Sequence, residues 1–282
     1  MCRFITYLGP PVRLERIVSE SEHSLVVQSY QPQEMTSGVV NVDGFGLGWY
    51  NPELESTPCV YTNTCPIWSD RNLPGLGHHI ASGCIFANVR SATPGQAVDQ
   101  SNCQPFVQRE LLFMHNGFIE NFRHTLMRPI RDALQDEYYT AIEGSTDSEH
   151  IFALLLQFLH GSAHTRENVQ TAMQATLDQL VSWAGPKHTQ LVLNLAVTNG
   201  EFVVAARFAS SAPAPSLYYA VDTAQFPHAA LIASERPFAS DAWQMVAEDE
   251  IIACDTELQL EHVAIHPREA VTRAPGSSQS AA

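Results

Sequence analysis

The strongest constraint on the fold of this chain is a helical hairpin that lies between two strand-rich halves. Residues 148–159 and 167–183 carry apolar side chains at helical spacing, and Gly185-Pro186 ends the second helix. Strand-like runs follow the hairpin at residues 190–198, 201–209, 217–221, 229–233, 250–255 and 258–265. Because strand and helix do not alternate regularly, the order predicts an α+β protein built in layers rather than a doubly wound parallel sheet.

The first residues of the chain, Met1 to Leu8, form an apolar, β-prone run that predicts a core strand. Its second residue, Cys2, carries a thiol. If Met1 is removed, Cys2 also carries a free α-amino group, and the thiol and the amine then form a nucleophile and base in one residue. The ordinary interpretation of Cys2 alone is a small buried side chain, because free cysteine is among the most buried residue types.

Composition narrows the classes of partner. The 15 basic and 30 acidic residues give a net charge of −15, which repels nucleic acids and anionic lipid surfaces, so we expect neither as a partner. The chain has no apolar run of the ~20 residues that a membrane span needs and no leader-like start, which favours a cytoplasmic protein. With 282 residues and no evident linker or repeat, we expect one domain at 2–266 and a disordered tail at 267–282.

Two further classes of site are not favoured. The six cysteines lack a CxxC pair, which favours reduced thiols, and no HExxH or clustered Cys/His spacing predicts a metal site. The glycine-rich stretch 38–50 lacks the GxGxxG spacing and is followed by Asn51-Pro52, so we expect no dinucleotide cofactor, and no other cofactor is indicated. Gly44, Gly46 and Gly48 instead suit a strand that another element approaches closely. We also expect a strand at 24–28 and a loop at 51–66.

Three polar positions each have a structural and a functional interpretation. Arg90 ends an apolar strand-like run and either reaches water or binds an anion. Asn116-Gly117 is typical of a tight turn, but an Asn amide and the following N–H can also donate together to one oxyanion. Asp147 is a favourable first-turn acid in a helix that Thr146 and Glu149 would cap as a capping box.

Five motifs in consistent order, covering roughly residues 2–240, resemble the class II glutamine amidotransferases, a family of N-terminal nucleophile hydrolases. They are Cys2, Arg90-Ser-Ala-Thr93-Pro-Gly95, Asn102-Cys-Gln-Pro105-Phe106, His115-Asn116-Gly117-Phe-Ile119-Glu-Asn121 and Ser145-Thr-Asp147-Ser-Glu149. Within the family, the segments MCR, DGFGLGWY, RSATPG and STDSEHIFALLL look most like the ergothioneine-pathway γ-glutamyl hydrolases, which act on a γ-glutamyl-hercynylcysteine S-oxide.

The resemblance implies a four-layer αββα sandwich and a site at the chain start. Cys2 would be the nucleophile and its own α-amine the base, while Asn116 and the Gly117 N–H would stabilise the oxyanion. Arg90, with Thr93 of the same motif, would bind the α-carboxylate side of a small γ-glutamyl substrate, and Asp147 would bind its α-ammonium. The reaction would pass through a γ-glutamyl thioester and release glutamate.

The resemblance also leaves alternatives open. Synthetase-linked members often carry Trp and His where this chain has Ser91 and Gln104, so the acceptor side differs. The chain could be a free-standing amidohydrolase, a glutaminase subunit that supplies ammonia to a separate synthetase partner, or a catalytically silent binding domain of the same fold. The leaving amine is not determined by the sequence, because it depends on loops such as 68–72.

Overall fold

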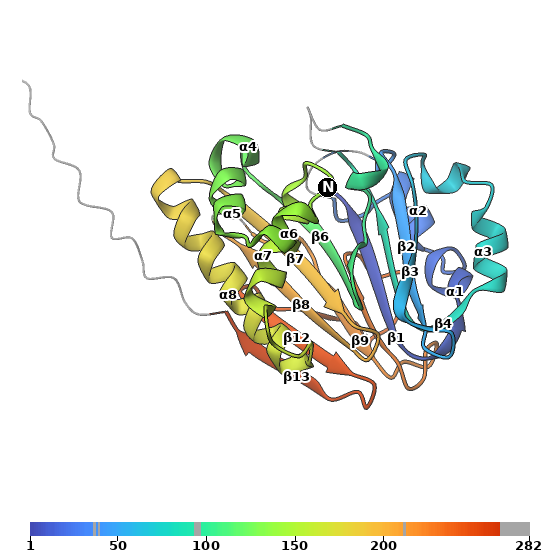
Figure 1. Ribbon diagram of the computed structural model, residues 1–282. Coiled ribbons are helices and arrows are strands. Elements are labelled where there is room, and N and C mark those ends of the chain that lie inside the picture. Colours follow the sequence, from blue (N-terminus) through green and yellow to red (C-terminus); the bar gives the residue numbers. More distant parts are fainter. Residues whose placement is uncertain (36–37, 39, 93–96, 211–212, 266–282) are drawn as a thin grey trace, which may run out of the picture.

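The computed structural model describes residues 1–282 except 36–37, 39, 93–96, 211–212 and 266–282. Two antiparallel sheets lie face to face, and helices cover the outer face of each (Figure 1). The predicted α+β, four-layer αββα arrangement is therefore confirmed. Thr93 and the predicted tail at 267–282 lie outside the described residues. No helix within the described ranges has both the length and the apolar character needed to cross a membrane.

The first sheet contains the strand that begins beside Cys2. Its spatial order is β11 (Gln244–Met245), β9 (Tyr218–Val221), β10 (Ala230–Ala233), β1 (Arg3–Arg13), β4 (Ala81–Val89), β2 (Phe45–Asn51) and β3 (Glu55–Asn63). β1 thus lies in the middle of the sheet, where β4 and β10 hold it on both sides. Its register with β4 pairs Arg3 with Val89 and Phe4 with Asn88.

The second sheet carries the strands on either side of the helical hairpin. Its order is β13 (Leu260–Ala264), β12 (Glu250–Asp255), β8 (Phe202–Ala209), β7 (Leu191–Thr198), β6 (Leu111–Ile119) and β5 (Phe106–Gln108). A turn at Asn199-Gly200 joins β7 to β8, and the strands predicted after the helical hairpin agree with the structure to within two residues.

Helices form the two outer layers (Figure 1). α1 (Leu14–Val18), α2 (Leu25–Tyr30) and α3 (Leu73–His79) cover the first sheet, while α4 (Phe122–Thr125), α5 (Met127–Ala133), α6 (Asp136–Thr140), α7 (Asp147–Leu159) and α8 (Arg166–Ala184) cover the second. Pro74 stands in the first turn of α3, where a missing N–H costs nothing.

Apolar side chains fill the three interfaces between the four layers of helices and sheets. One cluster joins α1–α3 to the first sheet, another joins α7 and α8 to the second, and a third lies between the sheets. Along β1, Phe4 and Leu8 face the layer between the sheets, while Ile5 and Tyr7 face the helices. This period of two follows from the pleat of a strand, and it decides which side chains can meet at the site.

Two local expectations were wrong, and one of the two interpretations of a third segment is excluded. Residues 24–28 begin α2, because the Ser24 hydroxyl accepts a hydrogen bond from the Val27 N–H and caps the helix. The expected loop at 51–66 contains β3, an edge strand, where Pro58 is tolerated. Asn116-Gly117 lies inside β6 and makes no turn.

Candidate active site

Cys2, Arg90 and Asn116 converge on one edge of the layer between the two sheets. Phe4, Phe86 and Met114 face that layer. Cys2, Arg90 and Asn116 lie an even number of residues from them along the same stretches of chain. Because side chains alternate between the two faces of a strand, they belong to the same face. Continuing the β1–β4 register by one residue sets Cys2 opposite Arg90. The structure thus brings together side chains that are separated by up to 114 residues of sequence.

The Cys2 thiol is partly buried and lies 3.9 Å from the backbone oxygen of Ser91. Met1 precedes it and packs its side chain against a small apolar cluster of Val192, Ala209 and Ala214, next to Phe118. Burial lowers the pKa of the Met1 α-ammonium below its usual value of 8.0; Cys2 and Asp43 act in the opposite direction, and Arg3 adds to the lowering.

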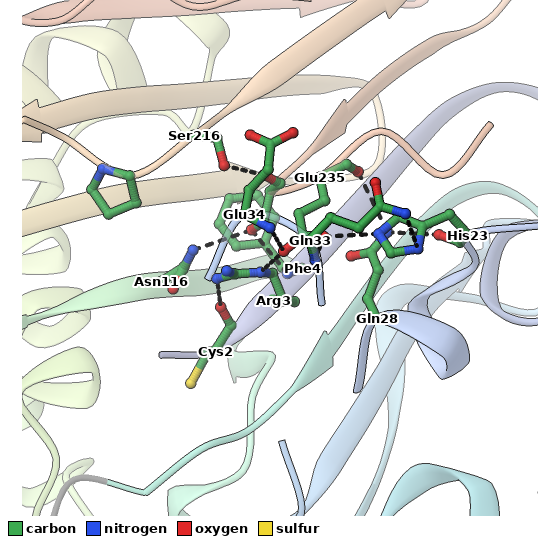
Figure 2. A network of polar contacts seen from close by, with 12 residues as sticks. Cys2, Arg3, Phe4, His23, Gln28, Gln33, Glu34, Asn116, Ser216 and Glu235 are labelled. Atoms are coloured by element: carbon green, nitrogen blue, oxygen red, sulfur yellow. Dashed lines mark hydrogen bonds and ion pairs between the residues drawn. The ribbon is translucent and has the colours of Figure 1, made fainter. Parts of the chain in front are cut away.

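A buried ionic network fixes the backbone of Cys2 (Figure 2). Arg3 donates through Nη1 to the Cys2 carbonyl oxygen at 2.8 Å and through Nε to Glu235 at 2.6 Å. Arg3 and Glu235 are each only 1% exposed. The remaining donors to the Glu235 carboxylate are His23 Nε2, Gln33 N and Glu34 N. Because a buried charge must be paired, this network holds Cys2 in one place.

The pKa of Glu235 shows how strongly the network favours the carboxylate. Burial alone would raise this pKa, but the hydrogen bonds from His23 and the Gln33 backbone, together with the Arg3 charge, outweigh burial and lower the pKa from 4.5 to about 2. A lowered pKa in the folded state contributes stability that is fully present above about pH 4.5 and is lost as the pH falls towards 2.

We therefore expect Glu235→Gln to lower the free energy of unfolding by about 3–5 kcal/mol at pH 7, since it leaves Arg3 buried without its counter-charge. The difference from the unchanged protein should shrink as the pH is lowered from 4.5 to 2. Urea unfolding at a series of pH values measures both effects. Glu248→Gln is the matched control, because Glu248 is 51% exposed and lies 3.8 Å from Arg207. Its cost should stay below about 1 kcal/mol, and an equal cost for both variants would contradict the role of Glu235.

Arg90 is 3% exposed, at the end of β4. It does not escape to water, which was one of the two sequence-based interpretations. Its Nη1 donates to the Asp43 carbonyl oxygen and its Nη2 to the Ala97 carbonyl oxygen, both at 3.2 Å. These two contacts help to fix the orientation of the planar guanidinium.

Asn116 and Gly117 are consecutive residues of β6 and pair with Asn194 and Leu193 of β7. Asn116 is fully buried, and its Nδ2 donates to the Ser234 hydroxyl at 3.3 Å. A Cβ atom on Gly117 would lie 1.8 Å from the Val192 carbonyl oxygen, so only glycine fits. Gly117 is therefore required by the close approach of β7 and not by a turn.

Asp147 begins α7 and is 7% exposed. Its Oδ2 accepts from the Ile119 N–H at 2.8 Å and its Oδ1 from the Ser148 N–H at 2.9 Å, so the helix start is tied to the end of β6. The Thr146 hydroxyl caps the helix as expected. Glu149, however, accepts from the N–H groups of residues 143 and 144 and does not complete the capping box.

Gln104 and His115, which both belong to the sequence motifs, form hydrogen bonds that connect β6 to the start of α7. The Gln104 Oε1 accepts from the His115 N–H at 2.6 Å, and its Nε2 donates to the Ser148 hydroxyl at 3.3 Å. His115 Nδ1 contacts that hydroxyl at 2.9 Å, and burial lowers the pKa of the imidazole. These residues join β6 to α7 and so couple the positions of Asn116 and Asp147.

Sequence reasoning missed Arg3, Ser234 and Glu235. A charged residue at the third position of an apolar, strand-like run was a signal that Arg3 needs a buried partner. Nothing in the local sequence identifies that partner, because Glu235 lies 232 residues away.

Comparison with known proteins decides the family. The sequence pattern of "Glutamine amidotransferases class-II" matches residues 18–254, which is more than half of the chain. The chain belongs to the class II glutamine amidotransferases. The expectation of an enzyme is thereby confirmed at the level of the family.

Two curated relatives of this amidotransferase show how far the similarity extends. It is 34% identical over 232 residues to the probable glutamine amidotransferase DUG3 of Saccharomyces cerevisiae, covering 75% of this chain and 64% of the relative. It is 33% identical over 120 residues to the gamma-glutamyl-hercynylcysteine sulfoxide hydrolase of Mycolicibacterium smegmatis, covering 43% of this chain and 52% of the relative. The chain thus spans less than two thirds of both relatives, and the longer match is to the yeast protein.

Solved structures agree with the fold of this amidotransferase. A glutamine aminotransferase class-II domain protein from Silicibacter pomeroyi has a TM-score of 0.68 at 25% identity, covering 94% of this chain and all of that one. The allosteric regulatory enzyme of purine biosynthesis has a TM-score of 0.65 at 15% identity, covering 94% of this chain and 49% of that one, and supports the fold alone.

Proposed function

We propose that this amidotransferase hydrolyses the γ-glutamyl amide bond of a small γ-glutamyl compound. The observation that most supports the proposal is the convergence of Cys2, Arg90 and Asn116 on one edge of the layer between the sheets. In this proposal Arg90, with Thr93, binds the α-carboxylate and Asp147 binds the α-ammonium, so that the γ-carbonyl carbon lies near the Cys2 thiol. A γ-glutamyl-hercynylcysteine S-oxide, the substrate named for the mycobacterial relative, is one candidate of this class.

The chemistry is acyl transfer. The Cys2 sulfur attacks the γ-carbonyl carbon while the α-amine of Cys2 takes the thiol proton, and Asn116 Nδ2 and the Gly117 N–H donate to the oxyanion. The oxyanion collapses to a thioester as the amine leaves with that proton. Water then attacks the thioester, which releases glutamate and restores the thiol.

A second candidate is supported by the longer match to a protein named as a probable glutamine amidotransferase. In that case the substrate is glutamine, and the ammonia passes to a separate synthetase partner. Both candidates use the same acyl-enzyme and differ only in the amine that leaves.

Glutamate release by the purified chain separates the two candidates. We expect faster release from γ-glutamyl thiol compounds than from glutamine, with no partner present. Equal or faster release from glutamine, with one ammonia for each glutamate, would favour the second candidate. Cys2→Ala serves as the control for contaminating hydrolases and should release glutamate from neither substrate.

The carboxylate role of Arg90 gives a further expectation. Arg90→Lys should raise KM and lower kcat/KM strongly, because a point charge replaces a planar fork that can hold both carboxylate oxygens. The effect should depend on the α-carboxylate. The kcat/KM for a γ-glutamyl substrate should fall in Arg90→Lys, whereas an acyl compound that lacks the α-carboxylate should be hydrolysed equally slowly by both proteins. Near-unchanged kcat/KM on the γ-glutamyl amide would remove Arg90 from the substrate site.

A further inference from the structure

Ser234 joins the strand of Cys2 to the strand of Asn116. It follows β10 directly and is fully buried. Its hydroxyl oxygen accepts from the Phe4 N–H at 3.1 Å and from Asn116 Nδ2 at 3.3 Å, and its own N–H donates to the Phe4 carbonyl oxygen at 3.0 Å. Among the described residues, it is therefore the one whose side chain hydrogen-bonds both to Asn116 and to the backbone of Phe4.

This arrangement leaves two polar groups unsatisfied. Asn116 Oδ1 is buried and has no hydrogen-bond partner within the described part of the chain. The Ser234 hydroxyl is used twice as an acceptor, so its single proton has no acceptor among the residues that the structure describes. A buried polar group without a partner is destabilising.

A half-turn of the Asn116 amide about its terminal torsion satisfies both groups without changing the shape of the side chain. The Ser234 hydroxyl then donates to Oδ1 and still accepts from the Phe4 N–H. Nδ2 takes the position that Oδ1 had, on the side away from Ser234, where it can donate to another oxygen.

We propose that Ser234 is a positioning residue: its hydroxyl donates to Asn116 Oδ1 and thereby directs Asn116 Nδ2 towards the oxyanion that forms when Cys2 attacks the substrate. This inference rests on the proposed function. Ser234 touches neither the substrate nor the reacting atoms, and its effect on the reaction passes through Asn116.

The test is a double-mutant cycle measured on glutamate release from a γ-glutamyl amide. Ser234→Ala should lower kcat by roughly 10- to 100-fold, less than the 10²–10³-fold that removal of an oxyanion donor costs, and should leave KM close to its original value. In an Asn116→Ala background the same change should lower kcat by less than about 2-fold, because the group through which Ser234 acts is already absent.

The outcomes separate positioning from a purely structural role. If Ser234 merely holds the backbone of Phe4, the change lowers kcat equally in both backgrounds, and this result overturns the inference. Unchanged kcat in Ser234→Ala overturns it as well. Ser216→Ala is the matched control, because the Ser216 hydroxyl donates to the Ser234 carbonyl oxygen without touching Asn116, and its kcat should stay near the original value.

The test also covers a variant that does not fold and a failure of the proposed function itself. If Ser234→Ala does not fold, Ser234→Cys replaces it in the same cycle, since a thiol donates only weakly. An unchanged kcat in Asn116→Ala alone, or no glutamate release by the unchanged protein, would count against the proposed function itself. Additive effects in an active enzyme would count only against Ser234.

Discussion

Protein that retains Met1 is expected to release glutamate at least roughly 10²–10⁴-fold more slowly than protein that begins at Cys2, which is the usual contribution of a positioned general base. A peptide bond to Met1 turns the proposed base into an amide nitrogen that cannot accept a proton. The Met1 side chain packs on the cluster of Val192, Ala209 and Ala214. The loss of the base acts on turnover and leaves the fold unchanged.

A bulky residue inserted between Met1 and Cys2 blocks the removal of Met1, and intact-mass analysis reports the first residue directly. The matched control carries a short leader with a protease site that ends immediately before Cys2. Cleavage of this leader should restore activity to the same preparation at an unchanged melting temperature. Full activity in protein that retains Met1 quantitatively would contradict the N-terminal nucleophile mechanism, and Cys2 would then be an ordinary core thiol.

Asn116→Ala is expected to lower kcat by about 10² to 10³, since it removes one preorganised donor from the oxyanion. KM should change little, because the donor acts mainly on the charge that develops in the transition state. Steady-state kinetics and a melting curve on the same preparation check the prediction. They also distinguish the loss of a donor from a loss of folded protein.

Asn194→Ala is the matched control for Asn116→Ala. Asn194 is the same residue type, equally buried, and directly opposite in β7. Its loss should lower the melting temperature while kcat stays close to the original value. A kcat that is unchanged in Asn116→Ala would leave the residue with a structural role in β6 and would remove it from the reaction.

The sequence predicted the layers of this fold better than its local details. Apolar periodicity placed α7 and α8 within two residues, since long amphipathic helices carry their signal locally. Short segments were predicted less well, because tertiary contacts outweigh propensity there. Asn116-Gly117 has the composition of a turn, yet β7 approaches Gly117 so closely that this glycine is needed within a strand.

For the candidate site, the sequence predicted the motif residues but not the residues that hold them in place. The motifs identified Cys2, Arg90, Asn116, Gly117 and Asp147, and all of these lie within the described residues. Their supports could not be identified, because Ser234 and Glu235 act across 118 and 232 residues of chain and belong to no local pattern. The proposed roles of the motif residues remain predictions that the variants above would test.

The position of β1 in the middle of its sheet has a consequence for the biosynthesis of the enzyme. β1 is completed on one side by β4 and on the other by β10, where Ile5 pairs with Ala233. The second neighbour emerges from the ribosome only after more than 200 residues have been made, which at ~5–20 residues per second takes roughly 10 to 50 s. During that time β1 has one open edge, and the residues around Met1 are accessible to an aminopeptidase. We therefore expect maturation of Cys2 to precede closure of the sheet.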